Sequence, residues 1–128
     1  MVGNATVACD TNADAAPAFS GVWNTNWGYI HVGTNGTNKI ASSYSYEHSD
    51  GTVSGRFWGP TEVIIWPHND GYKGQCTNVF YGTWSEDRFG EKHGGKLAFW
   101  IFESNPKQLF GKWEDEETGE TGQWNGSK

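Results

Sequence analysis

The chain has 128 residues, enough for one domain with a packed core, and a formal net charge of −6. Its 9 Lys and Arg residues are scattered instead of clustered, so we expect no nucleic-acid partner, because phosphate binding needs a positive surface. No segment approaches the roughly 18 continuous apolar residues of a membrane-spanning helix, so we expect no membrane partner.

Residues 1–19 form an arm of mainly small and polar residues ahead of the first strand-like segment. The arm has neither the basic start nor the apolar stretch of an intact signal peptide. It fits the head of a mature secreted chain, and we expect a secreted or periplasmic protein. The arm contains Cys9, and the only other cysteine is Cys76. These two residues either form a disulfide bond that ties the arm to the fold or are unrelated thiols.

Segments rich in aromatic and β-branched residues follow the arm and alternate with clusters of Gly, Asn and Asp, which is typical of a β-meander. Pro60 and Pro67 bracket the fifth segment, because proline interrupts the hydrogen-bond ladder of a sheet. The expected strands span residues 20–25, 28–33, 38–47, 52–58, 61–67, 75–84, 95–103 and 107–114, with a short closing segment at 122–126. A sheet of this kind hides its edges best by closing on itself. We therefore predict an all-β domain over residues 20–128, a single antiparallel meander of about eight strands closed into a small barrel.

A glycine followed two residues later by an aromatic residue recurs along the predicted strands. Residues i and i+2 share one face of a strand, so each glycine stands beside its ring and leaves room for a neighbouring ring. We predict that these pairs face the barrel interior, together with the apolar row Leu97, Phe99 and Ile101. The copies are Gly21-Val22-Trp23, Gly55-Arg56-Phe57, Gly82-Thr83-Trp84 and Gly111-Lys112-Trp113.

Several large rings fall on the opposite face of the predicted strands, namely those of Trp58, Trp66, Tyr81, Trp100 and Phe102. Large rings that face water are unusual, and three explanations stay open. The rings form an interface with a second copy of the chain, through Trp100 and Phe102. Alternatively, they are flat platforms for sugar rings. The third explanation is a covering loop or a different strand register.

The run at residues 21–32 (GVWNTNWGYIHV) resembles the opening hairpin of avidin-like and lipocalin-like up-and-down barrels, in which the Trp of a Gly-x-Trp motif closes one barrel end. Residues 82–84 and 109–113 are similar to later strands of bacterial avidin-like proteins. The resemblance covers about residues 20–126 and implies a calycin-type barrel. Avidins hold biotin with Asn, Ser, Tyr and Thr groups; Asn24 stands near the expected first-strand position, and the other groups have no clean match in order and spacing.

The third predicted strand carries the richest set of candidate ligand contacts. Ser42, Tyr44 and Tyr46 alternate along it and share the face that we expect to line the lumen. Rings of the glycine-aromatic rows and polar groups of the first hairpin complete the predicted site. The expected ligand-binding residues are Asn24, Thr25, Tyr29, Ser42, Tyr44, Tyr46, Phe57, Trp84, Phe99 and Trp113.

We predict a non-enzymatic protein that binds an apolar or aromatic small molecule in the lumen, because the sequence carries no motif of a nucleophilic, phosphate-binding or zinc-dependent enzyme. The histidines and cysteines lack metal-ligand spacing, so we expect no metal and no cofactor. Two alternatives remain open. One is a carbohydrate-binding lectin that uses exposed rings. The other is a cyclase or isomerase in which His31, Tyr44, Tyr46 or Glu47 moves a proton.

Overall fold

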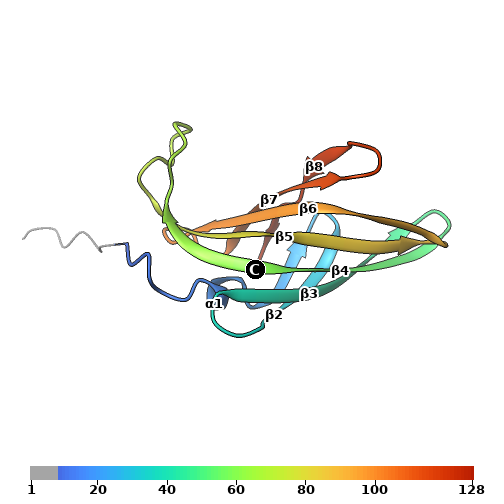
Figure 1. Cartoon of the computed structure of the whole chain (residues 1–128), viewed down its shortest axis with the longest axis horizontal. Coiled ribbons are helices and arrows are strands. Elements are labelled where there is room, and N and C mark those ends of the chain that lie inside the picture. Colours follow the sequence, from blue (N-terminus) through green and yellow to red (C-terminus); the bar gives the residue numbers. More distant parts are fainter. Residues whose placement is uncertain (1–8) are drawn as a thin grey trace, which may run out of the picture.

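The computed structural model describes residues 9–128 and shows an all-β chain (Figure 1). A short helix, α1 (Ala16–Phe19), precedes the strands and has Pro17 in its first turn. The strands are β1 (Gly21–Thr25), β2 (Gly28–Thr34), β3 (Lys39–His48), β4 (Gly51–Ile65), β5 (Cys76–Arg88), β6 (Glu91–Phe102), β7 (Gln108–Asp115), β8 (Thr121–Gln123) and β9 (Gly126–Ser127).

The strands form one closed antiparallel sheet. From β1 to β7 each strand pairs with the next along the chain. The short β9 pairs with both β1 and β7 and so closes the barrel, while β8 is an extra strand beside β7. The predicted fold class, an antiparallel meander closed into a small barrel of about eight strands, is confirmed.

Strand β4 corrects one of the predicted boundaries. The sequence predicts two strands at 52–58 and 61–67, but β4 runs without a break through this region as far as Ile65. The ladder between β4 and β5 skips Pro60 and the residue before it, then resumes at Thr61 in the same register. The missing N–H of Pro60 therefore falls where β4 and β5 do not pair, and the strand tolerates the proline.

The hairpin of β5 and β6 is longer than predicted. The sequence predicts strands at 75–84 and 95–103 with a connection between them, but β5 extends to Arg88 and β6 begins only three residues later. The turn consists of Phe89 and Gly90, whose φ angles are 54° and 94°. Two successive left-handed residues make the tight turn that suits the twist of a hairpin. The inward row of β5 therefore gains positions at this end of the barrel.

Aromatic rings fill the barrel interior. Phe57, Phe80, Phe99 and Trp124 are buried, and neighbouring ring centroids among them lie 5.3 to 5.9 Å apart. The interior of an eight-stranded barrel is just wide enough for side chains to fill. The core is thus a packed column of rings, held by edge-to-face and offset contacts.

Helix α1 closes one end of the barrel. The ring of Phe19 lies 6.4 Å from that of Phe80, and the indole N–H of Trp23 donates a hydrogen bond of 2.8 Å to the carbonyl of Phe19. The ammonium group of Lys128 lies 4.6 Å from the centroid of the Trp23 ring, a cation–π contact. The calycin-like architecture is therefore present, with a first-strand Trp at the closed end.

Three glycines of the repeat, Gly55, Gly82 and Gly111, make room for rings, as the sequence predicts, whereas a Cβ atom on Gly21 would meet the side chain of Lys128. A Cβ atom on Gly55 would fall on the ring of Tyr44, its partner on β3. A Cβ atom on Gly111 would lie 2.6 Å from both Cε1 of Phe99 and the carbonyl oxygen of Trp124. A ring of an adjacent strand therefore lies directly over Gly55 and over Gly111.

Replacing Gly111 by alanine should lower the free energy of unfolding by about 1 to 3 kcal/mol, because the added methyl group overpacks the core against Phe99. Gly33→Ala is the matched control, since its Cβ would meet the carbonyl oxygen of Ala41 at an ordinary 3.9 Å. Urea denaturation followed by Trp fluorescence measures both variants. Equal losses of stability in the two variants would contradict this account of the glycine repeat.

The loop at residues 66–75 covers part of the outward aromatic face. Trp66 and Phe102 are only 7% and 2% exposed, and Tyr72 of the loop stacks on Phe102 with 4.3 Å between ring centroids. Trp100 is half-buried and stacks on Trp66 at 5.6 Å. The covering loop is therefore the explanation that applies to Trp66 and Phe102, and Phe102 is not on the surface. Self-association through Trp100 stays a prediction.

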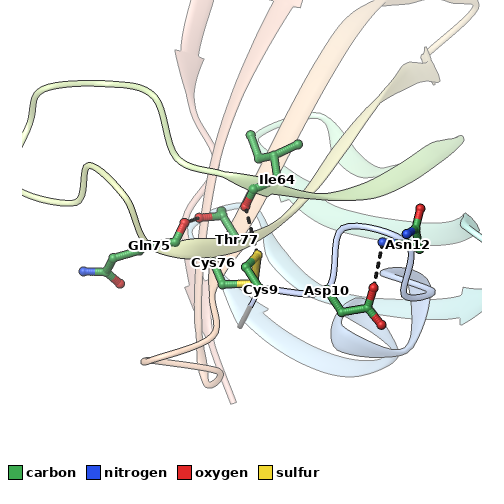
Figure 2. The surroundings of a disulfide bond; sticks show 7 residues. All are labelled: Cys9, Asp10, Asn12, Ile64, Gln75, Cys76 and Thr77. Atoms are coloured by element: carbon green, nitrogen blue, oxygen red, sulfur yellow. Dashed lines mark hydrogen bonds between the residues drawn. A yellow bond between two sulfur atoms is a disulfide. The ribbon is translucent and has the colours of Figure 1, made fainter. Parts of the chain in front are cut away.

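Cys9 and Cys76 form a disulfide bond, so that the first of the two alternatives is confirmed (Figure 2). Their Cα atoms lie 5.2 Å apart, and Cys76 is the first residue of β5. The Sγ atom of Cys9 lies 3.8 Å from the carbonyl oxygen of Ile64 in β4. The bond therefore ties the arm to the β4–β5 pair. The part of the predicted arm at residues 1–8 lies outside the described residues.

Removal of the disulfide in a Cys9→Ala, Cys76→Ala variant should lower the free energy of unfolding by about 4 kcal/mol, because the bond closes a loop between residues 67 positions apart. The gain in chain entropy of the unfolded state causes the loss. Urea denaturation of the variant and of the oxidised protein measures the difference. An unchanged unfolding midpoint would show that the arm does not constrain the unfolded chain.

Candidate functional site

The barrel end opposite α1 forms an open mouth. It lies where the inward rows of β3, β5 and β7 meet the β1–β2 turn. The space left between the side chains there has a volume of about 30 Å³, room for about two water molecules. The lining residues are Trp27, Tyr44, Tyr46, Trp84, Glu86, Arg88, Trp113 and Trp124.

The carboxylate of Glu86 is the polar centre of the mouth. Glu86 is 6% exposed, and the hydroxyl groups of Tyr44 and Tyr46 each donate a hydrogen bond of 2.7 Å to it, one to each oxygen. Arg88 donates a hydrogen bond from Nε and forms an ion pair with the same carboxylate. Burial of a charge is costly unless it is paired and hydrogen-bonded, and here both carboxylate oxygens are satisfied.

The network spans three strands, and Gly55 makes this reach feasible. The tyrosines lie on β3 and Glu86 on β5, with β4 between them. Gly55 pairs with Tyr44 on one side and with Glu86 on the other. A Cβ atom at this position would meet the tyrosine ring and would lie 2.9 Å from Cβ of Glu86. The missing side chain therefore opens the path between the phenol and the carboxylate.

Both tyrosines remain protonated at neutral pH. Burial raises the pKa of Tyr46 to about 12, and its hydrogen bond to Glu86 acts in the same direction. Burial and the hydrogen bond to Glu86 raise the pKa of Tyr44 further still. The phenols are thus fixed hydrogen-bond donors to Glu86, and neither is poised to give up its proton near neutral pH.

The walls of the mouth are aromatic and held in place. The ring of Trp27 stands edge-to-face against Tyr46 at 5.4 Å and against Trp113 at 5.9 Å. The indole N–H of Trp27 donates to the carbonyl of Gln123 at 3.1 Å, and that of Trp84 to the carbonyl of Glu114 at 3.0 Å. The rings therefore form a rigid cup around the Glu86 network, which we call the aromatic cup: Trp27, Tyr46, Trp84 and Trp113.

A second ion pair lies beside the mouth. His93 of β6 faces Glu86 in the strand register, and its Nδ1 atom lies 3.0 Å from Oδ2 of Asp115. The hydrogen bond to Asp115 raises the pKa of His93, although burial and the charge of Arg88 oppose the shift. Burial tends to raise the pKa of Asp115, but the hydrogen bonds from His93 and from backbone N–H groups outweigh it, so that the pKa is lowered.

The His93–Asp115 pair should make stability depend on pH. Because the pKa of His93 is raised in the fold, its contribution to stability is fully present below the ordinary pKa of 6.5. This contribution is lost as the pH rises through the raised pKa. Because the pKa of Asp115 is lowered, its contribution to stability is present above the ordinary pKa of 3.8. This contribution is lost as the pH falls through the lowered pKa. The melting-temperature difference between the wild type and His93→Gln should therefore be largest between these two values. The exposed His31→Gln serves as control, and a pH-independent difference for His93→Gln would contradict the pairing.

The structure brings several predicted ligand-binding residues into or beneath the mouth. Phe57 and Phe99 are fully buried in the ring column below it. Thr25 and Ser42 also face the interior, but both hydroxyl groups donate to backbone carbonyls, that of Ser42 to His31 at 2.8 Å. The predicted residues that line the mouth itself are Tyr44, Tyr46, Trp84 and Trp113.

Other predicted residues lie on the outside of the barrel. Asn24 is exposed, and Tyr29 is 61% exposed, so neither lines the mouth. His31 and Glu47, acid–base candidates of the enzyme alternative, are likewise exposed, and the carboxylate of Glu47 accepts a hydrogen bond of 2.9 Å from Thr52. In the strand register, these side chains lie on the outer face of the sheet, opposite the rings of Tyr44 and Tyr46.

The prediction misses the charged half of the site, Glu86 and Arg88. Both lie beyond the predicted end of the strand at 84, in a stretch of polar residues that reads as a connection. The alternation of side chains along the strand could have identified both residues, since Trp84, Glu86 and Arg88 follow one another on the same face of β5. A second signal was the pair of inward tyrosines, because two buried hydroxyl groups need an acceptor.

Comparison with family models, with curated proteins and with solved structures gives no match. Within residues 9–128, no cluster of three or more His, Cys, Asp or Glu side chains is arranged to hold a metal ion. No helix in that part of the chain has the length and apolar character needed to cross a membrane. The functional argument therefore depends on the geometry of the mouth.

Proposed function

We propose that the protein binds a small planar molecule with an anionic group, such as an aromatic acid, at the mouth of the barrel. The observation that carries the proposal is the aromatic cup together with Arg88, whose side chain is 32% exposed and lines the same mouth. This role resembles ligand binding by avidin-like and lipocalin-like barrels, except that the proposed ligand binds at the mouth and not in the lumen. Rings of the described residues fill the lumen beneath, so the part of the interior that is open to a ligand is the mouth.

The shape of the cup favours a flat ligand. The ring of Trp27 stands at 65° to Tyr46 and at 79° to Trp113, so that rings in different planes bound one small space. A single aromatic ring can stack on one wall while its edge meets another, the two arrangements that aromatic pairs prefer. The free volume of about 30 Å³ is too small for a whole ring, so the ring of the ligand lies over the rim of the cup and only its edge or a short substituent enters.

The charge of the cup favours an anionic ligand. Both oxygens of Glu86 already accept hydrogen bonds, so the carboxylate has little capacity left to hold a cation. Arg88 uses Nε for Glu86 and also interacts with the hydroxyl group of Tyr46, and the guanidinium group suits a carboxylate in the bidentate geometry. The polar contact offered to a ligand is therefore a positive hydrogen-bond donor.

We also propose that the protein works in an oxidising compartment, either outside the cell or in a periplasm. The Cys9–Cys76 disulfide supports this proposal, because such bonds persist in oxidising surroundings and are rare in the cytosol.

The test compares three probes of similar shape: phenylacetate, phenylacetamide and phenethylamine. The acid should bind most tightly and should shift the indole N–H signals of Trp27 and Trp113 in nitrogen-15 NMR spectra, leaving that of Trp58 on the outer face unchanged. Arg88→Gln should weaken binding of the acid about 10- to 100-fold, because a charge-assisted hydrogen bond is lost. Arg56→Gln, which changes the other arginine of the chain, is the matched control and should preserve binding.

Removal of Arg88 also leaves Glu86 without its cation, so a second variant guards against misfolding. In Glu86→Gln, Arg88→Gln the buried site is neutral, and this double variant should fold and still fail to discriminate the acid from the amide. Equal affinity for all three probes in the wild type, or no binding of any of them, would overturn the proposal.

A further inference from the structure

The outer face of the barrel carries a second site, separate from the mouth. A shallow groove runs over β4, β5, β6 and β7, with Trp58 and Tyr81 on one side and Lys96 and Lys112 on the other. Trp58 is 40% exposed and Tyr81 is 56% exposed. Unlike the rings beneath the 66–75 loop, these two rings are left open to solvent by the described part of the chain.

The strand register builds the groove. Trp58 pairs with Thr83, which pairs with Lys96, so that the ring and the ammonium group stand two strands apart. Tyr81 pairs with Ala98, which pairs with Lys112, and this gives the same spacing one step along the sheet. Two strand spacings are about 10 Å.

Short side chains make the floor of the groove. Thr83 and Ala98 lie between the rings and the lysines, and Gly82 lies beside them in β5. The groove is therefore a shallow channel with an aromatic wall and a basic wall.

The orientation of Trp58 is fixed from outside the groove. The guanidinium carbon of Arg56 lies 5.2 Å from the centroid of the Trp58 ring, a cation–π contact on one side of the indole. The contact holds the indole without burying it. A pre-positioned, exposed ring loses little conformational entropy when a ligand stacks on it.

The basic wall is unusual for a chain with a net charge of −6. Lys96 faces Glu114 across the β6–β7 ladder, whereas the ladder neighbours of Lys112 are Ala98 and Gln123, which are uncharged. The groove as a whole offers more positive than negative charge. An anionic ligand therefore complements it.

We propose that this groove binds an acidic glycan, in which successive sugar rings stack on Trp58 and Tyr81 and uronic acid carboxylates meet Lys96 and Lys112. The apolar face of a pyranose ring stacks on an exposed indole or phenol, and its hydroxyl groups remain free to contact Thr83 and water. The spacing between the two walls matches a ring that lies on one wall while its carboxylate points to the other. The site is independent of the mouth and does not depend on the ligand proposed there.

The experiment titrates the folded protein and its variants with a hexameric oligogalacturonate and, in parallel, with neutral cellohexaose; isothermal titration calorimetry measures the affinities, and the indole N–H signal of Trp58 locates the binding in the wild type. The acidic oligosaccharide should shift this signal saturably, with weaker binding as salt rises, because exposed charges are screened. Trp58→Ala should weaken binding about tenfold through the loss of ring contact. Lys96→Gln, Lys112→Gln should weaken it about 2- to 10-fold and remove the salt dependence.

Matched controls lie elsewhere on the surface. Tyr29→Ala removes a ring that is 61% exposed on β2, and Lys73→Gln removes an exposed lysine of the 66–75 loop. Both variants should bind like the wild type. Retained binding in Trp58→Ala would overturn the proposal. So would equal binding of the neutral hexamer, or light scattering of a dimer that Trp58→Ala dissociates, because the groove would then be an interface between copies of the chain.

Discussion

The width of the lumen is the constraint on which the other features of this barrel depend. Eight strands enclose a space that side chains fill almost completely, and this chain fills it with rings. A ring needs more room than the space above an ordinary strand residue, and Gly55 and Gly111 provide it, since a ring of the neighbouring strand lies over each. Within the described residues, the space between the rings opens at the mouth, where the volume is about 30 Å³.

The same constraint places a buried charge at the mouth. Gly55 lets the ring of Tyr44 cross β4 and reach Glu86, so that the carboxylate is compensated by two phenols and by Arg88. A buried carboxylate with fewer partners would destabilise the fold by leaving an unpaired charge. Because the network uses both carboxylate oxygens, it also determines the chemistry of the mouth. The carboxylate oxygens of Glu86 are satisfied, so the positive guanidinium group of Arg88, 32% exposed as a side chain, is the charged group that the mouth offers to a ligand.

Local sequence patterns predict much of this fold. The glycine–aromatic spacing indicates which face of each strand is buried, because side chains alternate strictly along a strand. The turn at Phe89 and Gly90 is harder to recognise, since a left-handed Phe replaces the Asn or Asp that usually precedes Gly there. Because the turn is not recognised, the predicted strand ends at residue 84 and leaves out Glu86 and Arg88. The burial of Phe102 depends on where the 66–75 loop folds back, which is a tertiary contact that strand alternation does not contain.

Both proposed sites offer positive groups on a chain with a net charge of −6. The overall field repels anions, so charge alone does not bring a simple inorganic anion to Arg88 or to the two lysines. Binding then requires a second contribution, and at each site an aromatic surface supplies it, the cup at the mouth and Trp58 with Tyr81 outside. A ligand must therefore combine an anionic group with a flat or apolar face. The net negative charge of the chain therefore contributes to selectivity, because it repels anions that gain no stacking contact with an aromatic ring.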